Sequence, residues 1–81
     1  MKETIIDKLL NRAVDTANRM NEQAKDGDIM RNNVNCGALT EIIYMLNQIG
    51  IDIEECTWKD GDYFKCAKIK VSGKELISFE D

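Results

Sequence analysis

The stretch that decides the fold is residues 31–46, RNNVNCGALTEIIYML, whose polar first half runs into an apolar second half. Apolar residues recur there at spacings of three and four, which predicts an amphipathic helix. Its main apolar stripe comprises Leu39, Ile42, Ile43, Leu46 and Ile49. Ala38, Tyr44 and Met45 extend the apolar surface around the helix, and Glu41 is the only charge within it. A helix of this kind is normally buried on more than one side.

The polar half predicts a loop in front of this helix, which we place at residues 33–48 with Asn33 or Asn35 at its start. Free backbone N–H groups at a helix start, beside an arginine and amide side chains, suit a nucleotide-like anion. The candidate ligand-binding residues are Arg31, Asn32, Asn33, Asn35 and Gly37. The simpler alternative, which we favour, is that Asn33 or Asn35 caps the helix and the other asparagines shape the turn.

Residues 3–25 predict a longer helix before that loop. Thr4 can cap its start together with Asp7, and Gly27 suits the left-handed residue after its end. A seam with the alternating spacings of a coiled coil runs along it. This seam comprises Ile6, Leu10, Ala13, Ala17, Met20 and Ala24. Its second half consists of alanines and one methionine, so another backbone could approach closely there.

Residues 51–79 alternate apolar and polar positions, which predicts a three-stranded antiparallel meander. The first hairpin loop is expected at residues 59–61, with the glycine in a left-handed position. Two registers fit this hairpin, one pairing Trp58 with Asp62 and the other pairing Trp58 with Phe64. In both registers one sheet face is apolar. That face comprises Ile51, Ile53, Ala67, Ile69, Val71, Ile77 and Phe79.

These elements predict a single α+β domain over residues 1–81, with two N-terminal helices packed on one face of a three-stranded antiparallel meander (ααβββ) in a two-layer sandwich. The first helix would be roughly 34 Å long and the strands only about 25 Å. We therefore predict a homo-oligomer, in the first place a dimer, with the helices at the interface. The interface candidates are Ala13, Ala17, Met20, Ala24, Tyr44 and Met45. The alternative is that the two helices simply pack on each other in a monomer.

The net charge of −4 is opposite in sign to that of most proteins that bind phosphate backbones, so we expect no direct binding of nucleic acid. No apolar run approaches the roughly 18 residues of a membrane span, so we expect no membrane partner. The first residues carry no signal-peptide pattern, and three cysteines without a C-x-x-C pair suit free thiols in a reducing compartment. We therefore expect a cytoplasmic protein, in the host cytoplasm if a phage encodes it.

The chain has no histidine, which removes the usual general base and a common metal ligand. We predict neither catalytic residues nor a metal or cofactor site, and so no enzyme. Cys36 is the most interesting thiol, because a place in the first turn of the second helix would lower its pKa. It has no base partner in the sequence, and a small residue near a cap is the simpler explanation.

The sheet face opposite the predicted core carries two aromatic residues among charges, the composition of a protein-interaction hot spot. The candidate partner-binding residues are Trp58, Phe64, Glu54, Asp60 and Asp62. The two hydrophobic thiols Cys56 and Cys66 are expected on the same face. The acids at the hairpin would suit a basic partner protein.

These observations favour a small non-catalytic protein that inhibits a partner, such as a host-defence protein, by stoichiometric binding. Very short, acidic, histidine-free proteins are typical of phage and mobile-element accessory genes. The alternative is a small-molecule sponge that holds a nucleotide-like anion at the loop 31–37.

Overall fold

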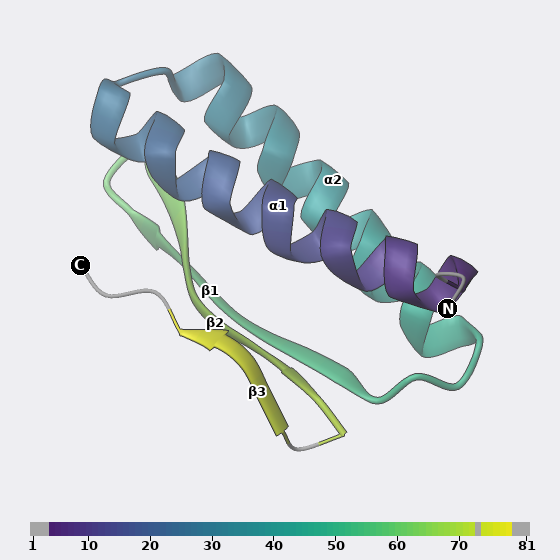
Figure 1. Cartoon of the computed structure of the whole chain (residues 1–81). Coiled ribbons are helices and arrows are strands. Elements are labelled where there is room, and N and C mark those ends of the chain that lie inside the picture. The colour runs from purple at the N-terminus through teal and green to yellow at the C-terminus, as the bar shows by residue number, and fades with distance from the viewer. Residues whose placement is uncertain (1–3, 73, 79–81) are drawn as a thin grey trace.

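The computed structural model describes residues 4–72 and, for residues 74–78, the backbone alone. Its elements are α1 (Ile5–Asp26), α2 (Ile29–Gln48), β1 (Ile53–Asp60), β2 (Tyr63–Val71) and β3 (Lys74–Ser78). The sheet order is β1-β2-β3, and both strand pairs are antiparallel. Figure 1 shows α1 and α2 lying side by side over one face of the sheet. Among the residues that the structure describes, no helix lies on the opposite face of β1 and β2.

The predicted two-layer α+β architecture, with two helices on an antiparallel sheet, is therefore confirmed. β3 pairs with the second half of β2, from Lys68 to Val71. The complete ααβββ core, with Ile77 and Phe79 in the apolar face, stays a prediction. Phe79 and the side chain of Ile77 lie outside the described residues.

Helix α1 begins and ends where its capping residues predict. The Thr4 hydroxyl accepts a hydrogen bond from the Asp7 backbone N–H at 3.0 Å, and the Asp7 carboxylate accepts one from the Thr4 N–H at 3.2 Å. This reciprocal pair is a capping box. Gly27 ends the helix at φ 76°, a left-handed conformation that favours glycine.

Helix α2 begins four residues or more before the predicted start, so the loop predicted at 31–37 is helical and neither Asn33 nor Asn35 is its cap. Asp28 is the N-cap, and its side chain accepts a hydrogen bond from the Arg31 backbone N–H at 3.2 Å. The missed signal was this aspartate directly after Gly27, because asparagines are common in turns and made the following stretch resemble one.

The alanine seam of α1 lies inside the monomer. Ala13, Ala17 and Met20 are fully buried, and Ala24 is half-buried. The whole buried core comprises Ala13, Ala17, Met20, Leu39, Ile42, Ile43, Leu46, Ile53, Cys66 and Ile69. The predicted role in an oligomer interface is therefore wrong for Ala13, Ala17 and Met20, which are buried inside the monomer where α1 packs against its own sheet and α2. For the half-buried Ala24 it stays a prediction. For Ala13, Ala17 and Met20 the alternative prediction is confirmed: α1 packs against α2 within one chain.

The first hairpin turns later than predicted. Its loop is Gly61-Asp62, closed by the pair Asp60–Tyr63, rather than residues 59–61. Gly61 has φ 64° and Asp62 does not have a positive φ, which is the pattern of a type II′ turn. Such a turn matches the right-handed twist of the strands that it joins.

Both predicted registers are wrong, because Trp58 lies opposite Lys65, and β2 also carries a β-bulge. Cys56 lies opposite Lys68 and Thr57 opposite Cys66, so Ala67 is an extra residue in β2. One extra residue reverses the alternation of side chains between the two sheet faces. In the part of β2 before the bulge, Phe64 and Cys66 therefore face the helices. With regular alternation they would face solvent.

Within the described residues, neither helix combines the length and the apolar character that a membrane crossing requires.

Candidate functional site

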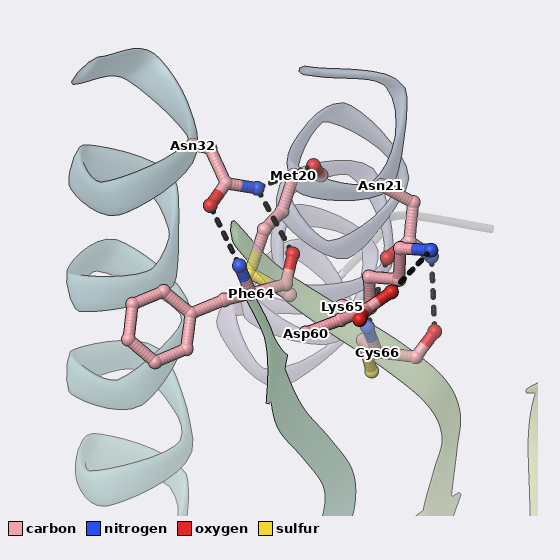
Figure 2. A network of polar contacts seen from close by, with 7 residues as sticks. All are labelled: Met20, Asn21, Asn32, Asp60, Phe64, Lys65 and Cys66. Atoms are coloured by element: carbon pink, nitrogen blue, oxygen red, sulfur yellow. Dashed lines mark hydrogen bonds and ion pairs between the residues drawn. The ribbon is translucent and has the colours of Figure 1, made fainter. Parts of the chain in front are cut away.

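The asparagine-rich stretch attaches α2 to the sheet. Asn32 is fully buried, and its amide oxygen accepts a hydrogen bond from the Phe64 backbone N–H at 2.8 Å. Its amide nitrogen donates to the backbone carbonyls of Phe64 at 2.9 Å and of Met20 at 2.8 Å. Figure 2 shows this side chain reaching from α2 to β2 and α1 at once. One carboxamide therefore joins three elements.

Asn21 makes the same paired contact from α1. Its amide donates to the Cys66 carbonyl at 2.9 Å and accepts from the Cys66 N–H at 2.8 Å (Figure 2). Among the described residues, β3 pairs with β2 from Lys68 onward, so the described part of the chain places no strand beside the earlier backbone groups of that edge. A side-chain carboxamide presents a donor and an acceptor side by side, as a peptide group does, and the two asparagines thus pair with this edge as a neighbouring strand would.

Three of the other candidate ligand residues also have partners inside the protein, and Gly37 is exposed within α2. Asn33 donates to the Ile29 carbonyl at 2.7 Å, and Asn35 donates to the Gln23 side chain at 2.7 Å. The Arg31 guanidinium lies 3.6 Å from the Asp28 carboxylate. The carboxylate of this N-cap therefore occupies the place where an anion would bind a helix start. The anion-site hypothesis at residues 31–37 loses the loop geometry on which it was based.

The exposed face of the hairpin is the first surface with binding character. We call it the hairpin face, and it comprises Glu54, Cys56, Trp58, Asp60, Lys65, Lys68 and Lys70. Trp58 lies opposite Lys65, which forms an ion pair with Asp60 at 3.1 Å (Figure 2). Trp58 is 37% exposed and stands beside carboxylates and ammonium groups. A shallow pocket on this face is lined by Glu54, Glu55, Cys56, Lys68 and Lys70.

Two residues predicted for this face belong to the other side of β2. Cys66 is 1% exposed within the core, and Phe64 packs against that core. The bulge at Ala67 causes the difference, because it turns both side chains toward the helices. Of the predicted aromatic pair, only Trp58 remains on the hairpin face. The predicted acids Glu54, Asp60 and Asp62 are exposed.

The predicted activation of Cys36 is also wrong. α2 begins at Ile29, so Cys36 lies two turns from the helix start and beyond the reach of the helix dipole. Partial burial, with a smaller contribution from the Glu55 carboxylate, raises the pKa of the Cys36 thiol above its ordinary value. Burial likewise raises the pKa of Cys66. Both thiols therefore carry less of the nucleophilic thiolate at neutral pH than a free cysteine does.

Helix α2 turns a second apolar surface to solvent. Met30 is 76% exposed, Val34 66% and Tyr44 59%. Together with Gly37 and Glu41 they follow the alternating spacings of four and three, and we call these five exposed residues the α2 seam. Met45 and Ile49, also exposed, lie beside it. The predicted interface residues include Tyr44 and Met45 but not Met30 and Val34, because the sequence of that part of α2 predicts a loop.

Within the part of the chain that the structure describes, no three cysteine or acidic side chains are grouped to hold a metal ion. No family model matches the chain, and comparison with curated proteins and with solved structures finds no match to either.

Proposed function

We propose that this chain is a small non-catalytic binding protein that acts by covering a site on another protein with its hairpin face. The observation that carries the proposal is Trp58, an aromatic side chain 37% exposed on the sheet face opposite the two described helices. Tryptophan is among the residues most enriched at the energetic centre of protein interfaces.

The charges around Trp58 indicate what such a partner would present. Asp60 and Asp62 lie at or beside the turn and are exposed, as is Glu54 farther along β1. Asp60 already neutralises Lys65, which weakens the basic side of the face. A partner with a hydrophobic pocket and basic residues near the turn would fit, since opposite charges steer association and fix orientation.

The proposal takes the sheet as the complete three-stranded meander predicted from the sequence, with β3 beside β2 and Ile77 and Phe79 in the core. It places the binding in the cytoplasm, where free thiols persist. Inhibition of a host protein by a phage or mobile-element accessory protein is the biological setting that we propose. The raised pKa of Cys36 makes this thiol a weaker nucleophile at neutral pH than a free cysteine.

The test compares Trp58→Ala with Lys59→Ala. Lys59 is the next residue along β1, is also exposed and lies on the opposite sheet face, so it is a matched control. The wild-type chain is first used to isolate a stoichiometric partner from its host, and affinities are then measured by calorimetry. We expect Trp58→Ala to weaken binding at least about 30-fold and Lys59→Ala to leave it unchanged.

A partner that binds Trp58→Ala as tightly as it binds the wild type would overturn the proposal. Circular dichroism of both variants verifies that the fold is intact. Charge reversal by Asp62→Lys gives a second measurement: the association rate should fall at low salt, because the electrostatic steering would be lost.

A further inference from the structure

The α2 seam points directly away from the core. Leu39, Ile42 and Leu46 are buried on the inner side of the helix, and the seam residues lie on its outer side. With Met45 and Ile49 the exposed apolar area is on the order of 500 Å², at the upper end of the largest patches found on monomers, about 300–600 Å². It is also a large part of the roughly 800 Å² per partner that a standard interface buries.

Gly37, at the middle of this seam, has no role within the monomer. It lies in the interior of α2, where glycine weakens a helix relative to alanine. Its φ is not in the left-handed region, and an added Cβ would meet nothing within 4 Å. No conformational or steric requirement of the single chain therefore calls for glycine here. Close approach of another backbone is a use that glycine at a helix surface can have.

We propose that a second copy of this chain docks on the α2 seam, with the two α2 helices antiparallel and crossing at Gly37. Met30 and Tyr44 lie seven residues before and after Gly37. A two-fold axis at this glycine therefore places Met30 of each copy against Tyr44 of the other, and both contacts form at once. Methionine sulfur packs favourably against aromatic rings. The pattern of large residues around a small centre is thus self-complementary.

The charges of α2 fit the same arrangement. Arg31 and Glu41 are the only charged residues between Ile29 and Gln48. An axis at Gly37 brings Arg31 of one helix within about one turn of Glu41 of the other, and the reverse pair forms by symmetry. A parallel pair would instead place like residues side by side. Charge complementarity therefore selects a second copy of this chain in antiparallel orientation.

The first experiment measures mass by sedimentation equilibrium between about 1 and 100 µM. We expect a dimer for the wild type and monomers for Val34→Glu and Tyr44→Glu, with association weakened about 100-fold or more. Trp58→Glu, on the hairpin face, is the control and should remain a dimer. Circular dichroism establishes that each variant is folded. A wild-type chain that is monomeric at 100 µM, or a dimer that both seam variants leave intact, would overturn the proposal.

The second experiment tests orientation by exchanging charges. Arg31→Glu and Glu41→Arg should each weaken the dimer, by up to about tenfold, because each creates two like-charge pairs across the interface. The double variant restores both pairs and should associate within about twofold of the wild type. If the loss of dimer association in the double variant equalled the two single losses combined, the antiparallel crossing would be contradicted. This result is independent of whether Trp58 binds a partner.

Discussion

At the residue scale, Asn32 shows how a polar side chain can hold a small core together. It is fully buried, yet each hydrogen-bonding group of its amide has a backbone partner. Within the described part of the chain, no buried side-chain nitrogen or oxygen lacks a hydrogen-bond partner. Asn32, Asn33 and Asn35 thus all bond to other groups of the same chain.

The first prediction concerns this amide. Asn32→Ala should lower the free energy of unfolding by about 2–4 kcal/mol, because it leaves the Phe64 backbone N–H and carbonyl buried without partners. Asn33→Ala is the matched control, since Asn33 is exposed and bonds only within its own helix. Its effect should stay within about 0.5 kcal/mol. Urea denaturation followed by circular dichroism measures both, and equal effects would contradict the role of Asn32.

The second prediction concerns the three thiols. Cys56 is exposed, Cys36 half-buried and Cys66 buried, and the pKa values of the last two are raised. Alkylation by iodoacetamide at pH 8 should therefore label Cys56 fastest, Cys36 more slowly and Cys66 slowest, since the thiolate is the reacting form. Mass spectrometry of peptides gives the three rates. In urea the three rates should converge, and a fast native rate at Cys66 would show that its core position is wrong.

At the element scale, the predictable features were those set by neighbouring residues. Thr4, Asp7 and Gly27 fix the ends of α1 through contacts three or four residues apart, and these caps are confirmed. The bulge at Ala67 could not be predicted in this way, because register depends on how the whole strand packs against distant helices. A residue as ordinary as alanine gives no local signal of a bulge.

The same contrast explains the errors at the candidate site. Regular alternation predicts Phe64 on the hairpin face, whereas the bulge puts it on the other side of the sheet. The local sequence predicts a loop at Asn32, because its partner Phe64 is 32 residues away in the sequence. Trp58 needed no long-range information, because β1 alternates regularly from Ile53 to Asp60.

The third prediction concerns the turn between β1 and β2. Gly61→Ala should lower the free energy of unfolding by about 1–2 kcal/mol, because φ is 64° at this position and a side chain is strained there. Asp62→Ala, the neighbouring position without a positive φ, should change it by less than about 0.5 kcal/mol. Thermal and urea unfolding test the pair, and a neutral Gly61→Ala would exclude the type II′ turn.

At the scale of the whole molecule, the two proposed surfaces lie on different layers. The hairpin face is on the side of the sheet away from the helices (Figure 1). The α2 seam is the exposed side of α2, opposite its buried residues. Dimerisation through one would leave the other free. A dimer would then carry two hairpin faces. A partner with two equivalent sites could bind both faces, and the effective concentration for the second binding event would depend on the distance between the two faces.

The pairing of Asn21 and Asn32 with β2 also bears on solubility. Unpaired strand edges are templates on which further chains can add as strands, the first step toward aggregates. The two amides pair with the backbone groups of Phe64 and Cys66, which the described part of β3 does not reach. Because these backbone groups are already bonded to side chains of the helices, another chain cannot add as a strand along that part of the edge. This protection does not depend on surface charge.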